Sequence, residues 1–221
     1  MRWLDTGSRV LARARMKRTL RAVGAAHAPS IPTWTRPEEL TTLYELASRL
    51  PHGSLAVEIG SYLGASTCYL AAGLSEVDGY LVCVDTWQNE SMPEGPRDTW
   101  AEFRANTRSF GDRLSAIRKR GADLDSADVP GPVLLAFIDG DHAYESVRAD
   151  ADALLPFLAM DAVLCFHDFG IDDHVGVTRV VGELLATGDW VPLRTVRSLM
   201  CLRRTRSPGA MPRGGPPSEG G

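Results

Sequence analysis

The sequence lacks cysteine pairs of the kind that bind zinc or form a disulfide framework. Its four cysteines stand far apart in apolar runs, and no CxxC pair occurs. They are Cys68, Cys83, Cys165 and Cys201. Such spacing predicts buried, reduced thiols. We therefore expect a cytoplasmic protein without disulfides.

Long hydrophobic runs are also missing. No apolar stretch approaches the roughly 20 residues that cross a bilayer as a helix. The basic N-terminus holds no continuous apolar segment, so it does not resemble a secretory signal. The sequence thus predicts no stable insertion into a membrane.

Positive charge is scarce outside the N-terminus. The 221-residue chain has a net charge of −4, yet residues 1–23 hold seven basic side chains and one acidic one. The rest of the chain is therefore strongly acidic. This argues against a nucleic-acid partner, because phosphate binding depends on clustered Lys and Arg. We expect a small-molecule substrate.

Composition divides the chain into three parts. Residues 1–30 predict a basic helical extension, residues 31–206 a globular domain, and the Pro- and Gly-rich residues 207–221 a disordered tail. Two interpretations of the basic helix stay open. It packs on its own domain or on a second subunit of a homodimer, or it touches an anionic surface. We favour packing.

Five short apolar segments alternate with segments of helical pattern. Apolar strands without internal alternation are typical of a parallel sheet that helices cover on both faces. The strand-like segments are residues 54–60, 80–85, 113–119, 133–139 and 162–168. The expected fold is a doubly wound, Rossmann-like α/β sheet.

The end of the domain breaks this alternation. Two further strand-like segments, 190–196 and 199–204, are separated only by Arg197 and Ser198. So short a connection must form a hairpin, which makes one strand antiparallel. We expect seven strands, mostly parallel, with a C-terminal antiparallel hairpin.

Acidic residues stand where parallel strands are expected to end. Asp85, Asp139 and Asp168 close three of the segments, and Asp123 follows another. In such sheets ligands bind outside the carboxyl ends of the strands, near the point where the strand order reverses. We therefore expect these acids to converge on one ligand-binding edge.

The first turn, "VEIGSYLGAS", lacks the third glycine of the dinucleotide fingerprint GxGxxG. Glu58 precedes this turn, where a carboxylate repels a pyrophosphate and attracts a cation. Asp85 suits a ribose, because a carboxylate accepts hydrogen bonds from both hydroxyls. Trp87 and Asp123 are placed to flank and hydrogen-bond an adenine. Ribose, adenine and a cationic amino acid together describe S-adenosylmethionine.

The chain resembles the class I S-adenosylmethionine-dependent methyltransferases over roughly residues 36–204. "EIGSYLGAS" is similar to the first motif of small catechol-type O-methyltransferases. "VDTW", "FIDGDHAYESVRADADALLPFL" and "FHDF" are similar to macrocin-type sugar O-methyltransferases of natural-product biosynthesis. The resemblance implies a methyltransferase domain over residues 31–206. The cofactor-binding residues that it implies are Glu58, Gly60, Ser61, Tyr62, Gly64, Ser66, Asp85, Thr86, Trp87, Asp123 and Asp139.

The stretch "LLAFIDGDHAYESV" carries the expected catalytic residues. Asp139 ends a strand and is expected to face both cofactor and acceptor. His142 stands at the offset that carries a lysine general base in catechol-type relatives, and an imidazole titrates near neutral pH. We expect His142 to accept the acceptor's proton. The alternatives are that Asp141 caps the next helix and that His142 only holds a neighbouring loop.

A metal site follows only from the resemblance. In metal-dependent relatives the position of Asp139 binds magnesium with two further oxygen ligands, to which His167 and Asp168 correspond. His167 departs from this pattern, because magnesium prefers oxygen and imidazole suits softer divalent metals. The alternative is a packed, hydrogen-bonded His167 and a capping Asp168.

Together these patterns predict an O-methyltransferase that modifies a hydroxyl of a small molecule, such as a sugar or phenol of a secondary metabolite. Three other functions stay open: a nicotinamide-dependent oxidoreductase, a metal-dependent hydrolase, and a non-catalytic protein that binds S-adenosylmethionine. Glu58 and the missing third glycine speak against the oxidoreductase.

Overall fold

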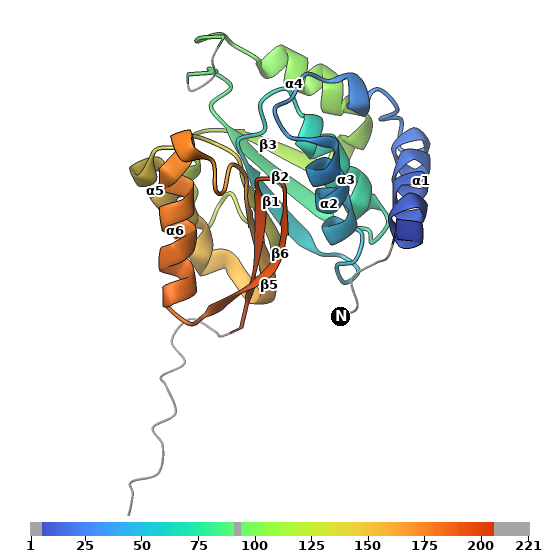
Figure 1. The fold of residues 1–221 in the computed structure, drawn as a ribbon. Coiled ribbons are helices and arrows are strands. Elements are labelled where there is room, and N and C mark those ends of the chain that lie inside the picture. The colour runs from blue at the N-terminus through green and yellow to red at the C-terminus, as the bar shows by residue number, and fades with distance from the viewer. Residues whose placement is uncertain (1–5, 91–93, 206–221) are drawn as a thin grey trace, which may run out of the picture.

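A seven-stranded sheet forms the centre of the computed structural model, which describes residues 6–90 and 94–205 (Figure 1). The strand order is β3-β2-β1-β4-β5-β7-β6. β7 pairs antiparallel with β5 and with β6, and the other pairs are parallel. The strands are β1 (Leu55–Ile59), β2 (Tyr80–Asp85), β3 (Leu114–Arg118), β4 (Val133–Ile138), β5 (Leu158–Phe166), β6 (Trp190–Val196) and β7 (Leu199–Arg204). The predicted fold, including the closing hairpin, is confirmed.

Helices cover both faces of the sheet. The first four pack on one face and the last two on the other (Figure 1). They are α1 (Thr6–Ala22), α2 (Pro37–Ala47), α3 (Ala65–Ser75), α4 (Trp100–Thr107), α5 (Tyr144–Leu154) and α6 (Val175–Ala186). The central strands are buried on both sides, which is why they read as continuous apolar runs.

Two helix boundaries differ from the sequence pattern. The apolar spacing predicts a helix over 144–158, yet α5 ends at Leu154 and β5 already begins at Leu158. Pro156 lies between them and lacks the N–H that a continuing helix would need. A threonine just before a helix is a common N-cap, but Arg36 holds that position in α2 and the Thr35 hydroxyl points to Asp139 Oδ2 at 3.4 Å.

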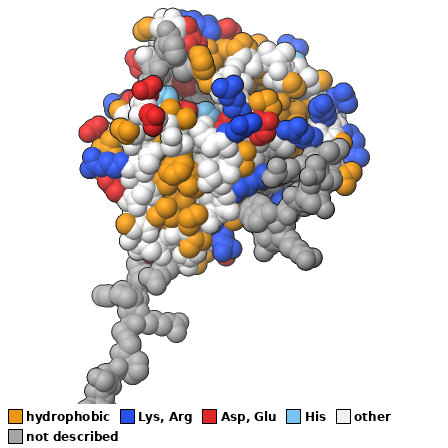
Figure 2. Space-filling view, in the orientation of Figure 1, with side chains coloured by type: hydrophobic (Ala, Val, Ile, Leu, Met, Phe, Trp, Pro, Cys, Tyr) orange, Lys and Arg blue, Asp and Glu red, His pale blue; other side chains and the backbone are white. Residues whose placement is uncertain are grey.

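The basic helix α1 packs on its own domain. Met16 and Leu20 are buried in the core beside α2 and α3, and Thr19 donates a hydrogen bond to Glu76, the residue that follows α3. Lys and Arg side chains gather toward the right of Figure 2, the side on which α1 lies in Figure 1. The predicted homodimer stays a prediction, and the predicted tail lies outside the described residues.

The strand order reverses between β1 and β4. The loop after β1 leads outward to α3 and the loop after β4 leads to α5, on opposite faces of the sheet. Such a point is where open α/β sheets bind ligands. Among the described residues, no helix is long and apolar enough to cross a membrane.

Candidate functional site

A cavity of about 430 Å³ opens at the carboxyl ends of β1 to β4. It lies at the position that the strand order favours for a ligand. Five residues that the sequence analysis assigns to the cofactor line it: Gly60, Tyr62, Asp85, Thr86 and Asp139.

Gly60 allows two loops to touch at the floor of the cavity. Its φ of +85° lies in the left-handed region, and a Cβ there would collide with the carbonyl oxygen of Asp139. Only glycine meets both demands without strain. The first turn and the end of β4 are therefore held in contact by the absence of a side chain.

Asp85 organises the backbone around the cavity. Its carboxylate accepts hydrogen bonds from the N–H groups of Tyr62 at 2.8 Å and Trp87 at 2.6 Å. Burial raises the pKa of Asp85, and these backbone hydrogen bonds act in the opposite direction. The carboxylate thus braces two loops and also faces the cavity.

Glu58 lies beneath the cavity and does not line it. The side chain is fully buried and accepts hydrogen bonds from Ser61 Oγ at 2.8 Å and from Thr67 Oγ1. Burial raises the pKa of Glu58 to about 7. Its Oε1 atom is buried without a hydrogen-bond partner among the described residues. Glu58 therefore stabilises the turn from below.

Five other predicted cofactor residues do not line the cavity: Ser61, Gly64, Ser66, Trp87 and Asp123. Trp87 is fully buried, donates its indole N–H to the Tyr62 carbonyl and packs against Trp100 and Phe103. Asp123 turns outward and forms an ion pair with Arg120 at 2.8 Å. A position near a strand end does not fix the direction of a side chain.

The cavity also includes residues that the sequence analysis missed. Gly121 and Ala122 line it after β3, and Asp150 reaches it from α5. Burial raises the pKa of Asp150 to about 6. A Cβ on Gly121 would approach Asp150 Oδ1 to 2.5 Å, so the glycine makes room for that carboxyl. The position of Asp150 inside a helix gave no signal of this role.

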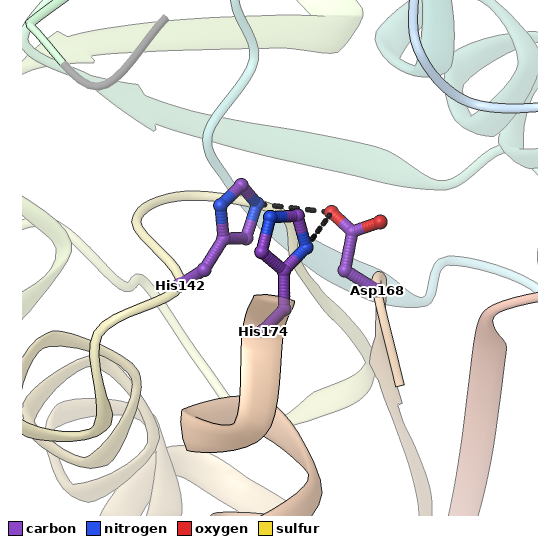
Figure 3. A group of neighbouring side chains, drawn as sticks. All are labelled: His142, Asp168 and His174. Carbon is purple, nitrogen blue, oxygen red and sulfur yellow. Dashed lines mark ion pairs between the residues drawn. The ribbon is translucent and has the colours of Figure 1, made fainter. Parts of the chain in front are cut away.

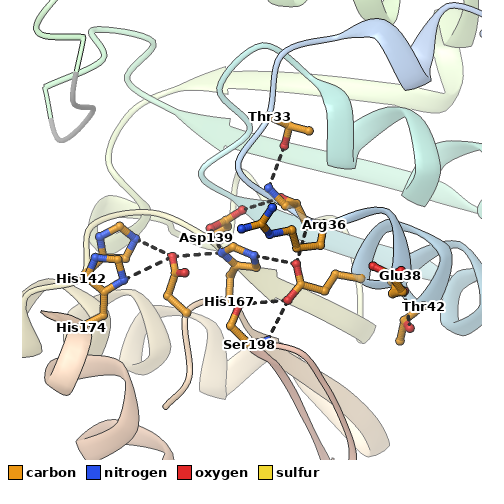
Figure 4. Close-up of polar contacts among 12 residues, drawn as sticks. Thr33, Arg36, Glu38, Thr42, Asp139, His142, His167, His174 and Ser198 are labelled. Carbon is orange, nitrogen blue, oxygen red and sulfur yellow. Dashed lines mark hydrogen bonds and ion pairs between the residues drawn. The ribbon is translucent and has the colours of Figure 1, made fainter. Parts of the chain in front are cut away.

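A polar cluster adjoins the cavity at Asp139 (Figure 4). His167 Nδ1 lies 3.1 Å from Asp139 Oδ1 and 3.0 Å from Asp168 Oδ2. On the other side of the ring, Nε2 lies 3.1 Å from Glu39 Oε2. The prediction missed Glu39, which α2 contributes. His167 is thus a buried imidazole held among three carboxylates, as one alternative expected.

The electrostatics of this cluster follow from burial and pairing. Burial lowers the pKa of His167, but Asp139, Asp168 and Glu39 outweigh it and raise the value to about 12. Burial likewise raises the pKa of Asp168, but hydrogen bonds from His142 and His167 hold it well below its usual value. His167 is therefore a cation and Asp168 an anion at neutral pH.

His142 belongs to the same cluster. Its Nε2 lies 2.9 Å from Asp168 Oδ2, and its ring stacks on that of His174 with centroids 3.8 Å apart. The Asp168 hydrogen bond raises the pKa of His142. Asp141 accepts hydrogen bonds from the N–H groups of His142 and Ala143 in the loop before α5, and Ala143 takes the N-cap position of this helix without a side-chain cap.

Comparison with known proteins identifies the family. A sequence model described as "Methyltransferase domain" matches residues 57–169, about half of the chain. The uncharacterized protein y4gI of Sinorhizobium fredii is 28% identical to this chain over 134 residues. That match covers 59% of this chain and 15% of y4gI, so the chain spans about 15% of that relative's length.

Solved structures share the fold. The O-methyltransferase NovP superposes with a TM-score of 0.62 at 16% identity, covering 76% of this chain and 80% of NovP. Cofactor-bound Rv0187 from MTB superposes with a TM-score of 0.62 at 21% identity, and the match covers 87% of this chain and 90% of Rv0187. The SAH-bound methyltransferase PaMTH1 of Podospora anserina superposes with a TM-score of 0.61 at 14% identity, and the match covers 94% of this chain and 99% of PaMTH1. Since the family match runs from within β1 through β5, the strands that build the cavity, the chain belongs to the methyltransferase domain family.

Proposed function

We propose that the protein transfers the methyl group of S-adenosylmethionine to a hydroxyl of a small molecule, a sugar or phenol of a secondary metabolite. The cofactor occupies the cavity at the β1–β4 switch point, and the acceptor lies on the side of His142. Membership of the methyltransferase family gives no support to the oxidoreductase or the hydrolase.

The observation that carries this proposal is the position of Asp139. Asp139 lines the cofactor cavity and also a smaller hollow that His142 and His167 line. Asp139 would therefore neighbour both a cofactor in the cavity and the histidine cluster. His142 lines the smaller hollow and not the larger cavity, and its side chain is 31% exposed.

The chemistry needs alignment and one proton acceptor. The acceptor oxygen attacks the methyl carbon in line with the carbon–sulfur bond, which breaks and leaves the neutral thioether. Alignment contributes about 7–11 kcal/mol at best. His142 donates Nε2–H to Asp168, so Nδ1 carries the lone pair that takes the hydroxyl proton.

The histidine–carboxylate pair favours oxygen over nitrogen as the acceptor atom. The fold also occurs in the N-methyltransferase NodS from Bradyrhizobium japonicum, with a TM-score of 0.54 at 18% identity. The fold alone therefore does not determine whether the acceptor atom is oxygen or nitrogen. A neutral amine is nucleophilic enough to attack the methyl group directly, whereas a hydroxyl is a weak nucleophile until it loses its proton. His142 and Asp168 supply a base for that step.

The donor atoms do not fit magnesium. Magnesium requires near-octahedral oxygen ligands. Of Asp139, His167 and Asp168, two offer oxygen, and the nitrogen of the third lies between them at 3.1 and 3.0 Å. We therefore derive no step through magnesium. The affinity for S-adenosylhomocysteine, measured by calorimetry, is expected to be equal with and without this ion.

The test replaces the proposed base. His142→Gln is expected to lower kcat about 10²- to 10⁴-fold on a hydroxylated acceptor, found by screening phenols and sugars for S-adenosylhomocysteine release. The affinity for S-adenosylhomocysteine should not change, because His142 lies outside the cavity. His52→Gln is the control, since that exposed ring pairs only loosely with Asp78 at 3.8 Å.

Two results would contradict the proposal. Near-wild-type rates in both His142→Gln and His142→Ala would eliminate this residue as the base. Tight binding of S-adenosylhomocysteine without transfer to any hydroxylated acceptor would favour the non-catalytic binding protein.

A further inference from the structure

Three side chains from separate segments meet beside the acceptor side of the cavity (Figure 3). His142 follows β4, Asp168 follows β5, and His174 precedes α6. His142 Nε2 and His174 Nδ1 lie 2.9 and 3.6 Å from the same oxygen, Asp168 Oδ2. All three ligand-type atoms lie within 4.8 Å of one another. One small volume thus receives two imidazole nitrogens and one carboxylate oxygen.

The backbone holds this arrangement in place. Gly176 opens α6 against the loop of His142, where a Cβ would collide with the His142 carbonyl oxygen. α5 and α6 are joined further along by Tyr144, whose hydroxyl lies 3.1 Å from both carboxylate oxygens of Glu183. Asp168 has a φ of +57°, a strained conformation for a residue other than glycine. Such strain is concentrated at functional sites.

His174 brings a nitrogen without a hydrogen-bond partner to this group of three residues. His174 Nδ1 is buried and unpaired among the described residues, although it faces Asp168. Buried polar atoms are normally satisfied, so an unpaired nitrogen directed at a carboxylate needs a reason. A cation between the two rings and the carboxylate would satisfy it.

We propose that His142, His174 and Asp168 bind a divalent transition metal of the zinc type, and that the bound ion inhibits methyl transfer. Two imidazoles and one carboxylate are typical ligands of zinc, which accepts four-coordinate geometry and leaves a position for water. The three side chains are partly exposed, at 31% for His142, 28% for His174 and 18% for Asp168, so an ion can enter.

The inhibition rests on the proposed function and follows from the two nitrogens of His142. Without metal, Nε2 carries the proton toward Asp168 and Nδ1 has the lone pair that accepts the acceptor's proton. An ion on Nε2 displaces that proton, and the neutral ring then carries its proton on Nδ1. The nitrogen that serves as the base is thereby blocked.

Zinc calorimetry on the full chain, without cofactor or acceptor, tests the site. The wild type is expected to bind one equivalent, and His174→Ala should weaken binding at least tenfold. His52→Ala, which removes a distant exposed histidine, should not change it. The four cysteines are buried and do not compete. His174→Gln, which keeps the side chain's bulk, replaces the alanine variant if that unfolds. No binding, or equal affinity in wild type and His174 variants, overturns the site.

Long-range ¹H–¹⁵N spectra of the imidazoles test the inhibition without an acceptor. Zinc is expected to move the protonated nitrogen of His142 from Nε2 to Nδ1, and an unchanged tautomer overturns the mechanism. With an acceptor, zinc should lower the wild-type rate at least tenfold and EDTA should restore it. An unchanged or faster rate overturns the inhibition. Because calorimetry and spectra use neither cofactor nor acceptor, failure of the proposed methyl transfer remains distinguishable.

Discussion

Glu39 and His167 are 128 positions apart in the chain and form a fully buried pair, with Glu39 Oε2 3.1 Å from His167 Nε2. Glu39 also accepts hydrogen bonds from the N–H groups of Arg36 and Ser198. Burial raises the pKa of Glu39, but the His167 and backbone hydrogen bonds outweigh this and lower it. This one carboxylate therefore joins α2, the end of β5 and the β6–β7 turn.

Removing the charge of Glu39 should destabilise the fold. Glu39→Gln keeps an acceptor oxygen but leaves the buried His167 cation without the charge of this partner, and breaking a buried ion pair costs about 3–5 kcal/mol. Urea unfolding measures the change in the free energy of unfolding. The neighbouring Glu38→Gln is the matched control, since Glu38 pairs with Arg13 at 3.6 Å in solvent and should change stability by less than about 1 kcal/mol. Equal losses in both variants would contradict the role of the buried pair.

Asp85 and Asp123 should differ in their effect on the cofactor. Asp85→Asn removes a charged acceptor that faces the cavity and braces Tyr62 and Trp87. Hydrogen bonds to charged groups contribute about 1.5–3 kcal/mol, so the affinity for S-adenosylhomocysteine should fall roughly 10- to 100-fold. Asp123→Asn should leave it nearly unchanged, because Asp123 does not line the cavity and only pairs with Arg120, which does. Calorimetry measures the two affinities. A larger loss in Asp123→Asn than in Asp85→Asn would support the cofactor-binding role that the sequence predicts for Asp123.

The strands and the edge that carries the cavity were predictable because local pattern determines them. Apolar runs without alternation marked the parallel strands, and acids at their ends marked the edge where Asp85 and Asp139 now line the cavity. The direction of a side chain is not local. Trp87 lies two positions after Asp85 yet packs into the core, because the α4 aromatic residues offer it an apolar environment.

Contacts between distant segments escaped prediction for the same reason. Glu39 reads as one of two acids in the first turn of an amphipathic helix, a position that ordinarily serves the helix N-terminus. His174 reads as a residue before the last helix. Only the packing of α2 and α6 against the end of β5 brings both side chains to the histidine cluster.

Gly60→Ala should weaken cofactor binding. The new Cβ would meet the Asp139 carbonyl and Gly140, both backbone atoms that cannot yield without moving the end of β4. We expect more than a tenfold loss of affinity for S-adenosylhomocysteine. Gly53→Ala is the control, because Gly53 has a similar φ of +75° but open space around it. It should cost only the backbone strain of about 1–2 kcal/mol in unfolding free energy and leave affinity intact. Equal affinities would show that the loops can separate.

Glu58 should make the stability of the cofactor-free protein depend on pH. Its folded pKa of about 7 lies above the ordinary value of 4.5, so its contribution is fully present below 4.5 and is lost as pH rises to about 7. Glu58→Gln stays neutral. Its free energy of unfolding, relative to wild type, should therefore rise by up to about 1.4 kcal/mol per pH unit across this window. Urea unfolding at half-unit steps from pH 4.5 to 8 measures the difference. A constant offset between the two proteins would mean that Glu58 ionises as an ordinary carboxylate despite its burial.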